Sequence, residues 1–242
     1  MSDRSELIEL HNRLSKTLDE ERGAAREKRY EKGYRTAREN LDDLVDKDSF
    51  VEYGQLAIAA QKSRRELEEL RTETAADGII TGFGKINSET LDDEKALSAI
   101  IINDYSVLAG TQGYYHHKKL DRICETAEKQ NLPVIMFTEG GGGRPGDTDV
   151  HVQFAGLNIP SFSNWAKLKG KSLRIAVNNG YCFAGNAALF GTADFCISTK
   201  NSWLGMAGPA MIEGGGLGKV NPKDIGPAEE QEKLGVIDYL AD

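Results

Sequence analysis

The sequence of 242 residues has little of three things, and each shortage excludes a class of protein. No apolar run approaches the ~20 residues of a membrane-spanning helix, and residues 1–4 do not resemble the start of a signal peptide. Positive charge is in deficit, since 30 Lys and Arg face 38 Asp and Glu, for a net charge of −8. Because phosphate contacts need clustered Lys and Arg, this balance argues against nucleic acid as a partner. We expect a cytoplasmic protein that binds neither nucleic acid nor membrane.

Cysteine is the third scarcity. Cys124, Cys182 and Cys196 are odd in number and their spacing fits no metal site, so we expect reduced, buried thiols. His116 and His117 have no Cys, Asp or third His at metal-binding spacing, which is more typical of surface or packing positions. The sequence therefore predicts a chain without a bound metal.

The first 45 residues differ in character from the rest. They are dense in charge, with few helix breakers and a row of leucines at helical spacing, which predicts an exposed N-terminal helical segment. The leucines are Leu7, Leu10, Leu14 and Leu18. A helix this polar is not stable alone, because most helical stability comes from tertiary packing. We therefore expect the row of leucines to pack on the main body or on a partner chain. We predict two units, residues 1–45 and a main domain over 46–242.

Apolar strands and amphipathic stretches alternate through the main domain. Over the whole chain 39% of the residues are apolar, which is enough for a substantial core. Strand-like segments are residues 50–53, 79–86 (an edge strand or hairpin), 97–103, 134–137, 173–177, 195–198 and 235–238, with a helix over 113–130. Such alternation favours an α/β fold with a mostly parallel sheet and helices outside it.

Two glycine clusters each follow a strand. Residues 140–143 are four glycines after the strand 134–137, and Gly185 lies in a turn after the strand 173–177 that leads into helix-compatible residues. Unhindered backbone N–H groups at such positions suit an oxyanion, and one such donor can lower a barrier by about 3 kcal/mol. The alternative for either cluster alone is an ordinary turn or a point of close packing.

Several segments resemble one family, the carboxyltransferase subunits of biotin-dependent acyl-CoA carboxylases, such as propionyl-CoA carboxylase beta. The matching segments are residues 34–41, 48–52, 77–84, 113–119, 138–144 and 182–187. Residues 138–144 occupy the place of the family's Asn-Asp-Ser-Gly-Gly-Ala-Arg, and 182–187 are similar to its Cys-Ala-Gly-Gly-Ala turn. The resemblance implies a crotonase-like β-β-α superhelix with an N-terminal helical extension.

Two departures from the family are visible. Asn186 stands where a second glycine is usual, and the chain ends where the family's N-terminal half ends. The family's active site lies between the N-terminal half of one subunit and the C-terminal half of another. The resemblance therefore implies the acyl-CoA half of a carboxyltransferase, in a homo-oligomer, working with a C-terminal half, biotin carboxylase and a biotin carboxyl carrier protein.

The implied chemistry moves a carboxyl group from carboxybiotin to the α-carbon of an acyl-CoA through an enolate. We expect the enolate oxygen to be held by the amides of Gly141 or Gly142 and of Gly185 or Asn186. For coenzyme A we expect a second group of residues, in which the cations meet phosphate. This group is Lys118, Lys119, Gly143, Arg144 and Ala184. The alternative for each cation is a solvated surface charge.

Other functions remain open on the sequence. A non-catalytic module that binds CoA esters or serves assembly is one, and a biotin-dependent acyl-CoA decarboxylase subunit is another. Residues 179–194 also resemble enoyl-CoA hydratases, but the two glutamates of those enzymes fall on Ala188 and Gly208, which cannot move a proton. We expect Asp194 to have a structural hydrogen-bonding role and Glu139 a turn or capping role.

Overall fold

The computed structural model describes residues 4–150 and 159–242, and these form a seven-stranded sheet in the order β1-β2-β3-β4-β5-β7-β9. The strands are β1 Val51–Glu52, β2 Ile79–Lys85, β3 Leu97–Asn103, β4 Val134–Phe137, β5 Arg174–Asn178, β7 Phe195–Thr199 and β9 Tyr239–Ala241. β1, β2 and β3 pair antiparallel, and the remaining pairs are parallel. Two short parallel strands, β6 Tyr181–Phe183 and β8 Trp203–Gly205, make a second sheet.

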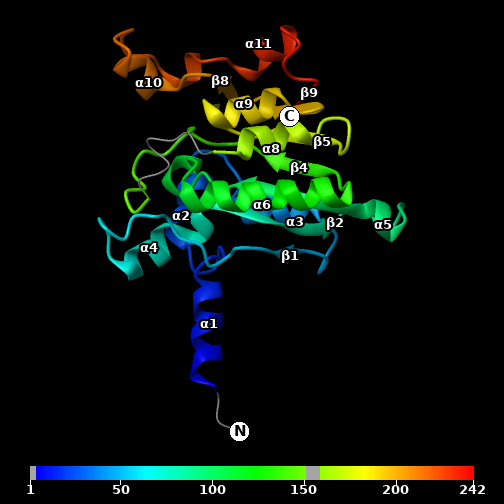
Figure 1. Cartoon of the computed structure of the whole chain (residues 1–242). Coiled ribbons are helices and arrows are strands. Elements are labelled where there is room, and N and C mark those ends of the chain that lie inside the picture. Colours follow the sequence, from blue (N-terminus) through cyan, green and yellow to red (C-terminus); the bar gives the residue numbers. More distant parts are fainter. Residues whose placement is uncertain (1–3, 151–158) are drawn as a thin grey trace.

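Helices cover the sheet and extend beyond it (Figure 1). They are α1 Ser5–Ser15, α2 Gly23–Tyr30, α3 Ala37–Leu44, α4 Leu67–Glu73, α5 Asp93–Ala96, α6 Tyr114–Gln130, α8 Ser161–Lys167, α9 Gly185–Gly191, α10 Pro209–Gly214 and α11 Ala228–Lys233. The described residues also form 3-10 turns at Ala75–Gly78, Leu108–Gly110 and Pro222–Asp224. The fold is mixed α/β with a central, mostly parallel sheet, as the sequence predicted.

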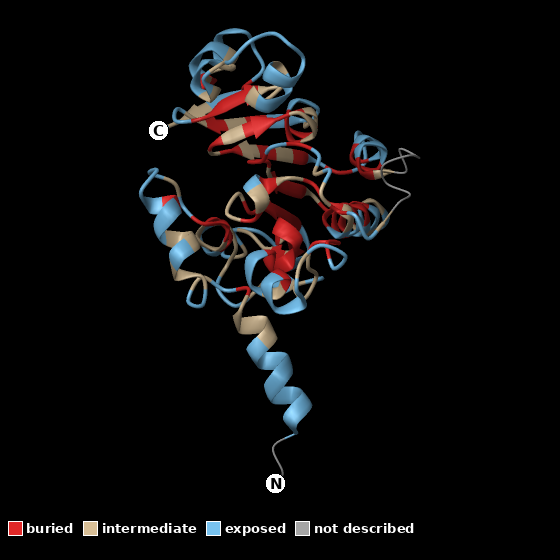
Figure 2. Cartoon of the chain, turned by 90° about the vertical axis from the view of Figure 1, so that its left-hand side faces the viewer, coloured by how far each residue is buried: buried red, intermediate tan, exposed pale blue. Residues whose placement is uncertain are grey.

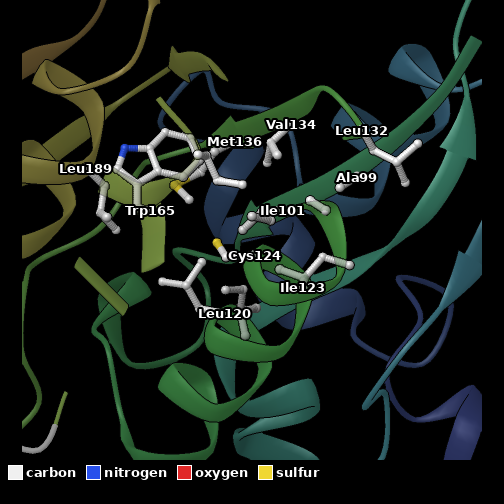
Figure 3. Close-up of a cluster of buried hydrophobic side chains, with 13 residues drawn as sticks. Ala99, Ile101, Leu120, Ile123, Cys124, Leu132, Val134, Met136, Trp165 and Leu189 are labelled. Atoms are coloured by element: carbon white, nitrogen blue, oxygen red, sulfur yellow. The ribbon is translucent and has the colours of Figure 1, made fainter. Parts of the chain in front are cut away.

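The core has two layers because residues of β3 alternate between the faces of the sheet. Ile101 joins the face covered by α6, where Leu120 and Ile123 pack (Figure 3). Ile100 and Ile102 point to the opposite face, where they meet α3. Each fully buried aliphatic side chain of this kind contributes about 1.5–3 kcal/mol relative to exposure.

The N-terminal helices behave differently from one another. α3 begins with a capping box, in which the Thr36 hydroxyl accepts from the Glu39 amide and the Glu39 carboxylate accepts from the Thr36 amide. α3 then buries Ala37 and Leu41 against the sheet. α1 has no buried residue and projects from the body (Figure 2). The boundary between residues 45 and 46 stays a prediction.

Most strand predictions agree with the structure, and one is wrong. The structure has no strand over residues 235–238; the strand that pairs with β7 is β9, which begins at Tyr239. Gly235 has φ +76°, so the chain turns there instead of extending. The Asp238 carboxylate then accepts a hydrogen bond from the Cys196 amide at 2.8 Å.

Candidate active site

The structure brings the two glycine segments together. Gly140 donates its amide to Tyr181 O at 2.7 Å and accepts from the Phe183 amide at 2.8 Å. One residue further along, a Cβ placed on Gly142 would lie 2.6 Å from the Ala184 Cβ. The loop after β4, residues 140–143, therefore lies against the turn after β6, residues 184–186. We call these the glycine loop and the α9 turn.

The α9 turn leaves backbone donors free. Ala184 has φ 52° and ψ −120°, a strained conformation for a residue with a side chain. The first amide to bond back to this turn is that of Ala188, which donates to Ala184 O at 3.0 Å. Within the described residues, the amides of Gly185 and Asn186 have no acceptor, as expected of a helix start.

In the glycine loop, by contrast, the amides of Gly140, Gly141 and Gly142 are occupied. The Gly141 amide donates to Ala109 O at 3.0 Å, and the Gly142 amide donates to the Asn186 Oδ1 at 3.0 Å. Both donors are therefore used inside the protein, where they fix the shape of the loop. That Gly141 or Gly142 holds an oxyanion stays a prediction.

The Asn186 side chain joins the glycine loop to the α9 turn by a hydrogen bond. The side chain is fully buried and accepts from the Gly142 amide. A Cβ on Gly140 would lie 2.2 Å from the Asn186 Nδ2 and 2.4 Å from Gly110 O, so the Nδ2 end faces the protein interior. The residue that departs from the family's usual glycine thus ties the loop to α9.

A third segment, residues 107–112, completes the site, and the sequence reasoning missed it. Leu108 and Ala109 have positive φ, and Ala109 O accepts from Gly141. The Ala109 amide has no acceptor in the part of the chain that the structure describes. Strained residues of this kind cluster at functional sites. A left-handed conformation at Leu or Ala cannot be recognised from the residue type. Gly110 is the one residue of this segment whose type indicates a turn.

Lys119 does not face a ligand. Its side chain is 9% exposed, and its Nζ donates to Ile79 O and, at 2.9 Å, to Ala76 O. Burial lowers the pKa of its ammonium from 10.5 to about 8. The structure thus places the Lys119 charge against internal carbonyls, and its contact with a coenzyme A phosphate stays a prediction.

Arg144 is also occupied. Its Nε donates to the Asp147 carboxylate at 2.8 Å, and its Nη2 donates to Asp147 and to the buried Asp77. With both carboxylates around it and a nearly buried side chain, Arg144 has no free edge for phosphate. Arg144 holds Asp147, whose carboxylate also accepts from the Tyr114 amide in the first turn of α6 at 2.7 Å. Its predicted contact with coenzyme A stays a prediction.

The other residues expected at the coenzyme A site remain accessible. Lys118 is exposed on α6, with its Nζ 5.6 Å from the Tyr114 ring centre. Gly143 is exposed, and Ala184 is half-buried. These three stay candidates.

A basic cavity reaches the third segment from the other side. It has a volume of about 370 Å³, includes Ala109 in its wall, and is lined by four cations in and on either side of α2, namely Arg22, Lys28, Arg29 and Lys32. Arg22 is paired with the Asp104 carboxylate at 2.6 Å, so Lys28 and Lys32 are its exposed cations. Glu21 and Glu73 also line the cavity.

Glu139 sits beneath the glycine loop as half of a buried ion pair. Arg29 donates to both of its oxygens, at 2.9 and 2.7 Å, and the Arg29 guanidinium lies 4.9 Å from the Tyr34 ring centre. Burial raises the pKa of the Glu139 carboxyl to about 7, against the effect of Arg29. The predicted turn or capping role is replaced by this pairing. Asp194 does have a structural partner, since its carboxylate accepts from the Arg174 Nε at 3.0 Å and Nη2 at 2.8 Å.

Two side chains stand over the α9 turn. A Cβ on Gly185 would lie 2.7 Å from the Gln112 Oε1 and 3.1 Å from the Phe162 Cζ. Phe162 is held through its neighbour Ser161, whose hydroxyl donates to the Asp121 carboxylate at 2.5 Å and lies 2.9 Å from the His117 Nδ1. The site is therefore a turn with free amides, bounded by one amide side chain and one aromatic ring.

The described part of the chain shows no cluster of three or more His, Cys, Asp or Glu that could hold a metal. Cys124, Cys182 and Cys196 are unbonded to one another and buried, as expected. None of the described helices is long and apolar enough to cross a bilayer.

Comparison with known proteins shows the family to which the chain is similar. A family model described as the carboxyl transferase domain matches residues 28–241. The solved structure of a single-chain, multi-domain long-chain acyl-CoA carboxylase is 49% identical, with a TM-score of 0.93, over 99% of this chain and 24% of that chain. A transcarboxylase 12S structure, a hexamer with methylmalonyl-CoA bound, is 25% identical with a TM-score of 0.77, over 100% of this chain and 45% of that chain.

A curated relative is the biotin-dependent acetyl-/propionyl-coenzyme A carboxylase beta5 subunit of Mycobacterium leprae. It is 30% identical over 238 residues, which are 97% of this chain and 41% of the relative. The chain thus spans about two fifths of the length of the curated relatives it matches.

Proposed function

Because the chain belongs to the carboxyl transferase domain family, we propose that it is the acyl-CoA-binding half of a biotin-dependent carboxyltransferase. The observation that carries the proposal is the α9 turn, which presents the unpaired amides of Gly185 and Asn186 beside the glycine loop. Amides that are fixed in advance need no reorganisation when charge develops, and each is worth about 3 kcal/mol of barrier.

The chain's contribution to the reaction is to bind the acyl thioester and hold its oxygen. The amides of Gly185, Asn186 and Ala109 have no acceptor among the described residues, and they would stabilise the enolate oxygen. Carboxybiotin, when bound, supplies the carboxyl group. Phe162 and the buried side chain of Gln112 would limit access of water to the acyl group.

For coenzyme A we propose the basic cavity as the phosphate end of the site. Ala109 connects the cavity to the glycine loop, and Lys28 and Lys32 supply positive charge there. Lys118, Gly143 and Ala184 remain the alternative lining from the sequence prediction. The variants Lys28→Ala and Lys118→Ala distinguish the two locations. The variant whose affinity for coenzyme A falls identifies the residue that lies near the phosphates.

The partners that follow from this function are a C-terminal carboxyltransferase half, biotin carboxylase, a biotin carboxyl carrier protein and further copies of the chain. A cytoplasmic location is part of the same proposal. The relatives are longer than this chain, which supports a requirement for the second half.

Two measurements test the proposal. Calorimetric titration of the chain with acetyl-, propionyl- and octanoyl-CoA should show binding of at least one, with free coenzyme A weaker. Mixing the chain with a C-terminal half, biotin carboxylase, carrier protein, ATP and labelled bicarbonate should then give labelled product from the bound acyl-CoA. A chain that binds none of the acyl-CoAs contradicts the proposal, and binding without transfer in the full mixture favours a non-catalytic module.

A further inference from the structure

The parallel part of the sheet is covered on one face and open on the other. On the covered face Ala176 of β5 and Cys196 of β7 pack with residues of α9 and α11. On the opposite face the strand register places Val177 of β5, Ile197 of β7 and Tyr239 of β9 side by side. Ile197 is half-buried, Tyr239 is 59% exposed, and neither belongs to an apolar cluster of the described residues.

A second row of apolar side chains lies two residues earlier on the same face. There Ile175 of β5 is next to Phe195 of β7, which is 41% exposed. α3 reaches this face at β5, where Ile175 and Val177 pack beside its apolar cluster. We call Ile175, Val177, Phe195, Ile197 and Tyr239 the open face.

An open face of this composition is unusual for parallel strands. Parallel sheets are normally buried on both faces, because both faces are apolar. A contiguous exposed apolar patch with a polar rim marks an interaction site. The rim here is charged on two sides, since Arg35 pairs with Asp43 of α3 at 2.9 Å and Lys200 pairs with Asp242 beside β9. An apolar centre with a polar rim is the arrangement of a protein–protein interface.

The shape of the open face indicates a helix as its occupant. A groove of about 560 Å³ runs between α3 and the strands, with Leu44 on one wall and Val177 and Thr199 on the other. Helices are the elements that cover parallel sheets, and one helix placed beside α3 would complete the layer. A second copy of the chain presents the same hollow, so two open faces would leave each other's groove unfilled.

The C-terminal half is the partner that can supply this helix. The curated relatives contain more than this chain, since the matches cover 41% and 39% of two of them. We propose that an amphipathic helix of the C-terminal carboxyltransferase half packs on the open face beside α3. The inference rests on the proposed function and adds to it a surface that joins the two halves. α9 packs on the covered face, so this surface is separate from the α9 turn.

Protection of an introduced cysteine tests the contact directly. Tyr239→Cys and Val51→Cys place a thiol at residues that are each 59% exposed, on the two opposite edge strands of the sheet. The natural cysteines are buried, so a maleimide reagent should label the new thiol first. In the isolated variants the two thiols should react at similar rates. With the C-terminal half of the reconstituted reaction in excess, labelling of Tyr239→Cys should slow at least about 10-fold, and that of Val51→Cys should not change.

Affinity for the C-terminal half is the second readout. Ile197→Glu puts a charge at the centre of the open face, and this affinity should fall at least about 10-fold, as when a central interface residue is lost. Val51→Glu is the matched control and should bind the C-terminal half like the wild type. Both variants should keep the wild-type affinity for propionyl-CoA, because neither residue lies at the α9 turn, and this shows that they are folded.

The inference is overturned if the C-terminal half binds but leaves Tyr239→Cys as reactive as before, or if Ile197→Glu keeps full affinity for it. Protection of Tyr239→Cys in the chain alone, rising with its concentration, would assign the open face to a second copy and overturn the inference too. If Ile197→Glu loses propionyl-CoA binding, the labelling result decides. Failure of the wild-type chain to bind the C-terminal half would instead contradict the proposed function.

Discussion

The two glycine segments look alike in sequence and differ in what they offer a ligand. The glycine loop has four consecutive glycines, yet the amides of Gly141 and Gly142 are used by Ala109 and Asn186. The α9 turn has one glycine, and its amides at Gly185 and Asn186 are free. The number of glycines therefore does not measure the capacity to bind an oxyanion; what counts is whether each N–H already has an acceptor.

The largest expected effect comes from Gly185→Val. The new side chain would meet the Gln112 Oε1 and the Phe162 Cζ, both ends of side chains that can move, so the fold should persist. It would occupy the space in front of the free amides, and turnover in the reconstituted reaction should fall at least about 100-fold, as when one oxyanion donor is lost.

Gly191→Val is the control for this substitution, because it lies at the other end of α9 and a Cβ there has no atom within 4 Å. Its turnover should match the wild type. An active Gly185→Val enzyme would show that the free amides of the α9 turn do not serve the reaction.

The stability of the folded chain should fall in acid because of His117, which contacts Ser161 beside Phe162. Burial, and then the nearby Arg144, lowers the pKa of His117 from 6.5 to about 4, so the unfolded chain binds a proton in this range that the folded chain excludes. Stability is then lost as pH falls from about 6.5 to about 4, by up to about 3 kcal/mol.

Chemical unfolding at pH 7, 5.5 and 4.5 measures this loss. His117→Asn, which removes the titrating ring, should flatten the profile between pH 6.5 and 4.5 relative to the wild type. An unchanged slope in the variant would mean that other groups cause it, and the packing of Phe162 would then be independent of His117.

Gly142→Ala should affect folding more than chemistry. Gly142 has φ +89°, and a Cβ there would lie 2.6 Å from the Ala184 Cβ, so strain and contact should cost about 1–3 kcal/mol of stability. Gly143→Ala is its control, since that site has no atom within 4 Å and should change stability by at most about 0.5 kcal/mol. Equal melting temperatures for the two variants would remove the distinction between a structural and an open glycine in the loop.

The smallest effect is expected at the cavity wall. Lys28→Ala removes one exposed cation, and the affinity for coenzyme A should fall about 3-fold, with a smaller difference at high salt because exposed charges are screened. If Lys118→Ala weakens binding and Lys28→Ala does not, the phosphates lie along α6 instead.

Much of the fold was readable from the sequence because it rests on periodicity. The α6 helix and the strands β4 and β5 carry apolar residues at the expected spacing, and parallel strands bring their carboxyl ends to one edge, so the meeting of the two glycine segments could be predicted. The last strand was misplaced because the left-handed Gly235 interrupts an otherwise strand-like run.

The site was less accessible to sequence reasoning because charge and conformation depend on tertiary contacts. Lys119 and Arg144 are cations of the kind that binds phosphate. Their residue type does not show that Lys119 contacts internal carbonyls, or that Arg144 is paired with two buried carboxylates. The left-handed Leu108 and Ala109 are held by the surrounding structure, and their sequence gives no sign of it.

The most direct test of the account is amide NMR of the chain during titration with propionyl-CoA. The N–H resonances of Gly185 and Asn186 should shift downfield as they gain an acceptor, while those of Gly141 and Gly142 keep the positions set by their internal bonds. Shifts at Gly141 and Gly142, with Gly185 and Asn186 unmoved, would contradict it.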